Sequence, residues 1–187
     1  MKIYLLDIEE AMTLAWQVHF YDVENVEIIC DSFEHFMKTH HVDGVVSPAN
    51  AFGIMDGGYD AAITEVFGET LQQKVQSYII NNFYGEQPVG TAFTIETDIP
   101  GTYLIHVPSM RVPEEIRDEG VVYQCMRVCL MEAKKHHLQS VVIPAFGGLT
   151  GQVPYKRVAE LMHKAYMQIE NPPRNLDWDY AIDTHYR

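Results

Sequence analysis

The chain has 187 residues, a length that suits one domain able to bury its own hydrophobic core. Hydrophobic residues make up 47% of it and charged residues 21%, a balance that excludes a disordered chain. The formal net charge of −13, from 26 acidic and 13 basic residues, argues against a nucleic-acid binder, which needs clustered Lys and Arg. Any phosphate site must therefore use backbone N–H groups and helix N-termini.

The first half of the chain alternates short apolar strands with helical patterns. Strands are predicted at residues 2–6, 26–30 and 42–46. Helices are predicted at residues 8–21, 57–67 and 71–83, with a brief helical turn at 33–37 capped by Asp31 or Ser32. In the first helix, Leu14, Val18 and Tyr21 recur at three- and four-residue spacings beside Ala11 and Ala15, a pattern typical of a helix.

The second half continues the alternation. Strands are predicted at 91–95 and 103–107, around a turn that contains Pro100, and at 141–143. Helices are predicted at 121–137 and from Pro154 to about 169, and residues 180–182 as a closing strand. Strands alternating with long helices predict a three-layer α/β/α fold with a mixed, mostly parallel sheet. The whole chain, 1–187, is expected to form this single domain.

The three cysteines, Cys30, Cys125 and Cys129, form neither a disulfide framework nor a zinc-binding pattern. We interpret them as free buried thiols in a reducing compartment. No apolar run approaches the ~20 residues that span a bilayer, and the first residues are typical of a strand rather than of a signal peptide. We therefore expect a cytoplasmic protein with no membrane partner, and nothing in the pattern calls for a metal or a cofactor.

Two loops stand out, because ligands of open α/β sheets bind outside the carboxyl ends of the strands. One is the loop 47–60 after the strand 42–46, and the other is the loop 144–154 after the strand 141–143. Each contains glycines and leads into a helix. Such a loop lets backbone N–H groups approach a phosphate while the helix dipole adds favourable charge. The two loops together predict a clasp for a diphosphate.

The same segments carry a resemblance to a known family. DGVVSPAN at residues 43–50, followed by GGYD at 57–60, resembles the macro domain family, in which an Asn is followed by six residues and then Gly-Gly-hydrophobic-Asp. The loop 144–154 resembles the other phosphate-facing loop of that family, and residues 28–31 resemble the place of its adenine-binding Asp. The likeness covers roughly residues 26–170, so residues 1–25 form an atypical strand-helix extension. Details such as MRVP at 110–113 resemble a bacterial and phage-type branch.

This resemblance implies a cleft for ADP-ribose or an ADP-ribosylated molecule. Asp31 would accept a hydrogen bond from the adenine amino group, and Gly57 and Gly58 would let the backbone approach the ligand. Asn50 would bind the distal ribose, and Asp60 would lie beside its anomeric carbon. The other ligand residues that the resemblance implies are Ser47, Ala49, Phe52, Phe146, Gly147, Gly148, Leu149, Thr150 and Gly151.

Structural alternatives exist for three of these positions. Asp31 is also explained as a helix cap, Asn50 as a loop residue that satisfies the backbone, and Asp60 as an acid in the first turn of a helix. The sequence also departs from the family at several points. Ser47 stands where the family has its first Asn, and Tyr59 stands where it has a hydrophobic residue. The aromatic residue of the second loop is missing, with Phe52 or Phe146 as its substitute.

The resemblance implies an enzyme with Asn50 and Asp60 as its catalytic residues. It would hydrolyse ADP-ribosyl bonds, as a mono-ADP-ribosyl hydrolase or an O-acyl-ADP-ribose deacylase. Cleavage at the anomeric carbon passes through an oxocarbenium-like transition state, for which Asp60 would position a water molecule. One alternative is a non-catalytic reader of ADP-ribose or a related signal. A Rossmann-like methyltransferase is a weaker alternative, because no Gly-x-Gly-x-x-Gly follows the first strand.

Overall fold

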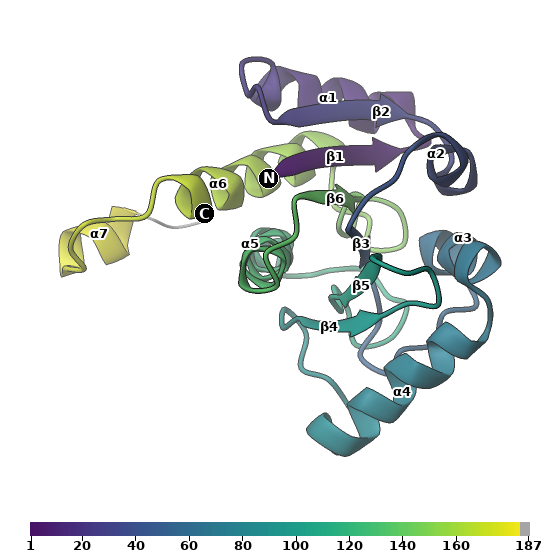
Figure 1. Cartoon of the computed structure of the whole chain (residues 1–187). Coiled ribbons are helices and arrows are strands. Elements are labelled where there is room, and N and C mark those ends of the chain that lie inside the picture. Colours follow the sequence, from purple (N-terminus) through teal and green to yellow (C-terminus); the bar gives the residue numbers. More distant parts are fainter. Residues whose placement is uncertain (184–187) are drawn as a thin grey trace.

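The computed structural model describes residues 1–183, which form a six-stranded sheet between two layers of helices (Figure 1). The strands are β1 Lys2–Asp7, β2 Val26–Cys30, β3 Gly44–Ser47, β4 Phe93–Glu96, β5 Tyr103–His106 and β6 Ser140–Ile143. The helices are α1 Glu10–Phe20, α2 Phe33–Thr39, α3 Gly58–Phe67, α4 Thr70–Phe83, α5 Gly120–Lys135, α6 Tyr155–Glu170 and α7 Trp178–Asp183.

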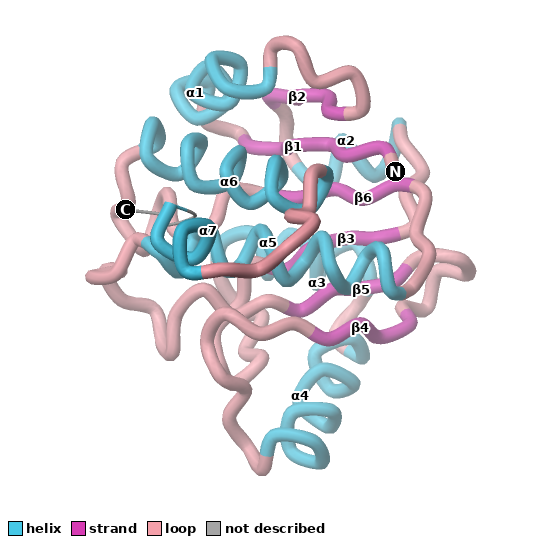
Figure 2. The backbone as a smooth tube through the Cα atoms, turned by 90° about the vertical axis from the view of Figure 1, so that its left-hand side faces the viewer, coloured by secondary structure: helices cyan, strands magenta, loops and turns pink. Residues whose placement is uncertain are grey.

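The strand order across the sheet is β2-β1-β6-β3-β5-β4 (Figure 2). Every neighbouring pair is parallel except β4 with β5, which is antiparallel. Helices α1, α5 and α6 cover one face of the sheet, and α2, α3 and α4 cover the other (Figure 1). The predicted three-layer α/β/α fold with a mixed, mostly parallel sheet is therefore confirmed.

Successive residues of the central strands enter opposite hydrophobic clusters. In β6, Val141 and Ile143 pack with α1, α5 and α6, whereas Val142 packs with α2, α3 and α4. Leu104 and Ile105 of β5 divide between the clusters in the same way. Strands buried on both faces have continuous apolar sequences. Such continuous apolar runs are the reason that these strands could be predicted from the sequence.

Helix α1 forms as predicted, and it packs on the sheet with a face other than the one that carries Leu14, Val18 and Tyr21. Leu14, Val18 and Tyr21 are 52%, 71% and 82% exposed. The buried side chains include Trp16 and Phe20. Both sets of residues recur at helical spacing, and the set with the larger aromatic side chains buries more apolar area against the sheet. Apolar periodicity alone did not distinguish the two faces.

The last described residues form a helix, so the prediction of a closing strand at 180–182 is wrong. Helix α7 extends from the end of α6 away from the sheet (Figure 1). The backbone N–H of Tyr180 donates to the Asp177 side chain over 2.8 Å, a bond typical of a capped first helical turn. The Gln168 amide of α6 donates to the Tyr180 hydroxyl over 3.0 Å. The Asp177 cap overrides the apolar composition of this segment.

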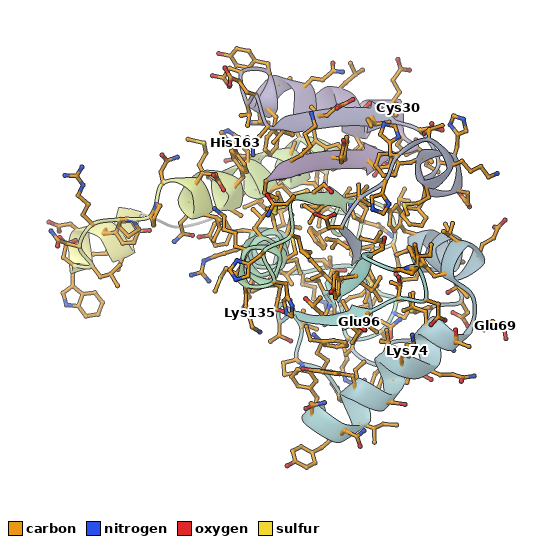
Figure 3. The ribbon with its side chains drawn as sticks, in the orientation of Figure 1. Cys30, Glu69, Lys74, Glu96, Lys135 and His163 are labelled. Atoms are coloured by element: carbon orange, nitrogen blue, oxygen red, sulfur yellow. The ribbon has the colours of Figure 1, made fainter. Side chains whose placement is uncertain are left out.

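The cysteines are free, but they differ in burial. Cys125 and Cys129 are buried in α5, as expected, whereas Cys30 is exposed at the end of the edge strand β2 (Figure 3). The edge position explains the difference, because one side of β2 has no neighbouring strand. Within residues 1–183, no helix combines the length and the apolar character needed to cross a membrane.

Replacing Trp16 with Ala should destabilise the protein by about 3–5 kcal/mol, because the change leaves a cavity in place of a fully buried indole ring. Val18→Ala, on the exposed face of the same helix, should change the free energy of unfolding by no more than about 0.5 kcal/mol. Urea denaturation measures both values. Equal losses for the two variants would contradict the observed orientation of α1.

Candidate functional site

A cavity of about 560 Å³ lies at the carboxyl ends of the parallel strands. Its lining comes from the segments that follow β1, β2, β3, β5 and β6, and from the first turns of α2 and α3. Eleven of the residues expected to contact a ligand meet there. They are Asp31, Ala49, Asn50, Gly57, Gly58, Asp60, Gly147, Gly148, Leu149, Thr150 and Gly151.

The strand order arranges these segments in a row. Asp31 follows β2 at one end of the sheet edge, the glycine loop 147–151 follows β6 in the middle, and Asn50 follows β3 beyond it (Figure 2). Because parallel strands carry their carboxyl ends at the same edge, residues far apart in the sequence become neighbours along the cleft. The cleft is therefore elongated along the sheet edge.

Three of the expected ligand residues do not line the cavity, which corrects the sequence interpretation. Phe146 is fully buried in the core between the sheet and α1, α5 and α6, where its ring gains more from apolar packing than from a polar cleft. Phe52 packs beneath the Arg111 guanidinium, 4.9 Å from the ring centre. Ser47 is buried behind the cavity, where it hydrogen-bonds Asp60.

Asp60 is a buried carboxylate in the first turn of α3, only 7% exposed. Burial raises the pKa of Asp60 to about 6, and a hydrogen bond donated by the Ser47 hydroxyl over 2.7 Å acts against this rise. An ordinary first-turn acid is solvated, whereas this carboxylate is desolvated at the edge of a cavity. Asp60 is therefore ionised at neutral pH but has an increased affinity for a proton, as a general base requires.

The Asn50 side chain is occupied by its own loop. Its amide Nδ2 donates to the Ile54 carbonyl over 2.7 Å, and its Oδ1 accepts from the backbone N–H groups of Phe52 and Ile54 at 3.1 and 3.3 Å. These three bonds match the structural alternative for Asn50. In this structure the residue lines the cavity while it shapes the segment 50–54.

Asp31 accepts a hydrogen bond from the Ser32 backbone N–H over 2.7 Å and bonds the His35 ring nitrogen Nδ1. The hydrogen bond to His35 lowers the pKa of Asp31, so its carboxylate is ionised over a wide pH range. The cap of α2 is Ser32, whose hydroxyl accepts from the His35 backbone N–H over 3.2 Å. Asp31 thus keeps acceptor capacity toward the cavity.

The glycines of both loops expose main-chain atoms at the lining of the cavity. Gly58 has a φ of +56°, and a Cβ at Gly57 or Gly58 would meet no atom within 4 Å, so these two residues border open space. In the second loop, a Cβ at Gly147 or at Gly151 would lie 2.6 Å from the Ile116 side chain. Gly147 also has a φ of +74°, and a Cβ at Gly151 would lie 2.7 Å from the Gly147 carbonyl oxygen, so the second loop favours glycine at both points.

The charges around the cavity are all negative. The acids of the lining are Asp7, Asp31, Glu34, Asp56 and Asp60, and no Lys, Arg or His belongs to the lining within the described residues. Positive potential for an anion at this lining therefore comes from main-chain N–H groups and the N-terminus of α3 rather than from cationic side chains. Within residues 1–183, no group of three or more His, Cys, Asp or Glu side chains is placed to hold a metal ion.

Several lining residues were not identified from the sequence, among them Asp7, Phe33, Tyr59, Ser109 and Met110. Burial raises the pKa of Asp7, and the Phe33 and Tyr59 rings pack 5.1 Å apart. The available signal was position, because Asp7 and Ser109 lie close to the carboxyl ends of predicted strands. The rule that ligands bind at the carboxyl ends of strands applies to the segments after β1 and β5 as much as to the two glycine loops.

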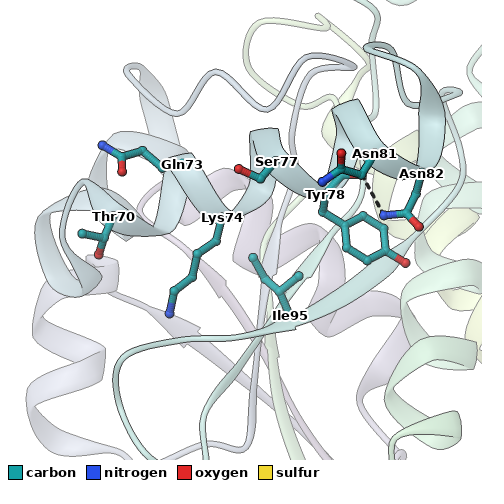
Figure 4. A pocket seen from close by; sticks show the side chains of 8 residues that line it. All are labelled: Thr70, Gln73, Lys74, Ser77, Tyr78, Asn81, Asn82 and Ile95. Atoms are coloured by element: carbon teal, nitrogen blue, oxygen red, sulfur yellow. Dashed lines mark hydrogen bonds between the residues drawn. The ribbon is translucent and has the colours of Figure 1, made fainter.

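A second hollow lies along α4 and the edge strand β4 (Figure 4). Its lining consists of Thr70, Gln73, Lys74, Ser77, Tyr78, Asn81, Asn82 and Ile95. It lies away from the carboxyl ends of the parallel strands, and its cation Lys74 pairs with Asp98 over 2.7 Å. The hollow is a shallow polar surface, so we place the candidate site in the first cavity.

Comparison with known proteins agrees with this arrangement. The family model described as "Macro domain" matches residues 46–162. An uncharacterized protein of Aquifex aeolicus is 31% identical over 143 residues, which cover 75% of this chain and 81% of that protein. The Oceanobacillus iheyensis macrodomain with ADP has a TM-score of 0.60 and 23% identity, covering 67% of this chain and 68% of that one. A variant of that macrodomain with ADPR has a TM-score of 0.60 and 22% identity, covering 69% and 71%.

Asp60→Asn should stabilise the protein more at pH 7.5 than at pH 4. The pKa of Asp60 is higher in the folded state, about 6, than its ordinary value of 3.8, so ionisation penalises the fold as pH rises through this window. The penalty is on the order of 3 kcal/mol, and the variant lacks it. Thermal denaturation at the two pH values measures the difference, with Asp56→Asn as the control for the loss of one charge. A difference in melting temperature that does not change with pH would contradict the desolvation of Asp60.

Proposed function

The chain belongs to the macro domain family, and we propose that its cleft binds ADP-ribose and hydrolyses an ADP-ribosyl bond. The observation that carries the proposal is the position of the buried Asp60 carboxylate at the edge of a cleft built from two glycine loops. The loops offer main-chain donors for a diphosphate. The Asp60 carboxylate offers a general base for cleavage of the ADP-ribosyl bond.

The row of segments along the sheet edge matches the order of groups in ADP-ribose. Asp31 accepts from the adenine amino group at one end, and the loop 147–151 and the start of α3 hold the diphosphate in the middle. The distal ribose then lies beyond the glycine loop, toward Asn50 and Asp60. The Oceanobacillus iheyensis macrodomain and its variant, which share this fold, carry ADP and ADPR. Those ligands support the assignment of the cleft.

The proposed reaction is attack of water at the anomeric carbon of the distal ribose. As the bond to the leaving group lengthens, positive charge develops on the sugar ring, and the Asp60 carboxylate stabilises it. The attacking water forms the new C–O bond and gives its proton to Asp60. The leaving group takes its proton from solvent or from the substrate itself. The raised pKa of Asp60 favours the transfer of the proton from water.

The bonds of Asn50 favour a second candidate function, a reader that binds ADP-ribose without cleaving it. The amide expected to hold the distal ribose is bonded to the backbone of residues 52 and 54. A ribose held less firmly loses part of the rate gain that comes from orientation. The reader and the hydrolase share the same cleft, and turnover separates them.

The proposed partner is ADP-ribose or a molecule that carries it. The acids of the cleft disfavour a polyanion such as nucleic acid, because the described lining offers no cationic side chain to its extended phosphate backbone. The proposal retains the cytoplasmic location expected from the sequence.

The protein should bind ADP-ribose with a dissociation constant in the low micromolar range or tighter, as measured by isothermal titration calorimetry. Asp31→Ala should weaken binding about tenfold or more, because the adenine amino group loses a charged acceptor. Glu27→Gln removes a charge from β2, the strand that precedes Asp31, outside the cleft and should leave the affinity unchanged. No heat and no thermal shift at high ligand concentration would remove the proposal.

Asp60→Asn should lower the rate of ADP-ribose release from a mono-ADP-ribosylated protein by about 10²–10⁴-fold while ADP-ribose still binds. The wild-type rate should rise between pH 5 and pH 7, because Asp60 acts in its ionised form and its pKa is about 6. Rates measured across this range, with Ser47→Ala as a second variant, check both points. Loss of the Ser47 hydrogen bond removes a pKa-lowering contact, so the rise should move to higher pH. If the wild-type protein binds ADP-ribose and releases none, the reader function replaces the hydrolase.

A further inference from the structure

Buried polar atoms without a partner are few, and two of them border the cleft. Among the described residues, the unpartnered atoms are Trp16 Nε1, Tyr59 Oη, His106 Nε2 and Ser109 Oγ. Tyr59 and Ser109 line the cavity. A buried hydroxyl that bonds nothing destabilises a free protein, because its lost hydration is not replaced. Such groups are retained most readily where a ligand supplies the missing bond.

The sheet holds Ser109 at the opposite end of the cleft from Asp31. The Ser109 backbone N–H donates to the Ala49 carbonyl over 2.9 Å, which continues the parallel pairing of β5 with β3 beyond the ends of the strands. The strand order places Asp31 after β2 and Ser109 after β5, with the loop 147–151 between them (Figure 2). When adenine lies at Asp31 and the diphosphate at that loop, Ser109 lies at the distal ribose.

We propose that the Ser109 hydroxyl hydrogen-bonds the distal ribose of ADP-ribose and thereby distinguishes ADP-ribose from ADP, which lacks that sugar. The inference rests on the proposed function, because the position of adenine sets the direction of the ligand. A serine hydroxyl donates one hydrogen bond and accepts others, and so do the hydroxyls of a ribose. A pairing between them satisfies both groups.

The environment of Ser109 fits this role. The side chain is 2% exposed, and rotation about χ1 moves Oγ among three staggered positions without moving the backbone. Asn50, the neighbouring group at this end, already bonds its own loop. Tyr59 is less suitable, because its oxygen is fixed by a ring that packs on Phe33 near Asp31. Ser109 is thus the cleft hydroxyl with unused bonding capacity at the ribose end.

The test compares Ser109→Ala with the wild-type protein by calorimetric titration of ADP-ribose and of ADP. The affinity for ADP-ribose should fall about three- to tenfold, the effect of one lost hydrogen bond. The affinity for ADP should be unchanged, because ADP does not reach Ser109. The melting temperature of the free protein should stay the same or rise, because an unpartnered hydroxyl is removed.

Thr102→Val is the matched control, at the opposite end of β5 from Ser109. Thr102 is buried just before the amino end of β5, and its hydroxyl donates to the Val42 carbonyl over 3.2 Å. Loss of this satisfied hydroxyl should lower the melting temperature and leave both affinities unchanged. The two variants therefore differ in the direction of their effects on stability and on binding.

Three outcomes would overturn the inference. They are an unchanged affinity of Ser109→Ala for ADP-ribose, an equal loss of affinity for ADP, and a fall in melting temperature as large as that of Thr102→Val. If the wild-type protein binds neither nucleotide, the proposed function fails together with this inference. If the wild-type protein binds ADP-ribose and Ser109→Ala binds it equally well, this inference alone fails.

Discussion

The parallel pairing of β3 with β5 and β6 is the constraint on which the site depends. It continues past the strand ends, where the Val107 N–H donates to the Ser47 carbonyl and the Ala49 N–H donates to the Val107 carbonyl. The buried ladder brings the carboxyl ends of its strands to one edge and so sets the order of the loops along the cleft. A shift of one residue in this register would exchange the side chains of β3 and β5 between the two hydrophobic clusters and would displace the loops that line the cleft.

The proposed function places two electrostatic requirements on this cleft. A diphosphate needs positive potential, which comes here from main-chain amides and the N-terminus of α3, since the described lining holds no cationic side chain. A base needs a carboxylate with an increased affinity for a proton, which comes from burying Asp60. A lysine in the cleft would strengthen anion binding, but it would also lower the pKa of Asp60. The absence of cations from the lining is therefore compatible with both requirements.

The sequence predicted the strands and the glycine loops because both leave local patterns, a continuous apolar run and a strand-to-helix turn rich in glycine. Sequence patterns did not predict the features that depend on which neighbours a side chain contacts in the folded protein. The spacing of Leu14 and Val18 is as helical as that of Trp16 and Phe20, and the sheet decides which pair is buried. Phe146 joins the core rather than the cleft. The bonds of Asn50 and the unpartnered hydroxyl of Ser109 are properties of assembled loops, and local sequence does not encode them.

Ile116 fills the space that side chains at Gly147 and Gly151 would otherwise occupy, and its N–H donates to the Gly151 carbonyl over 2.9 Å. The glycine loop 147–151 is therefore supported from outside by the segment that leads into α5. A methyl group at either glycine would displace Ile116, and removal of the isoleucine side chain would leave the loop without this support. Positions 116, 147 and 151 are therefore coupled through packing, so a change at one of them alters the shape of the loop that the other two define.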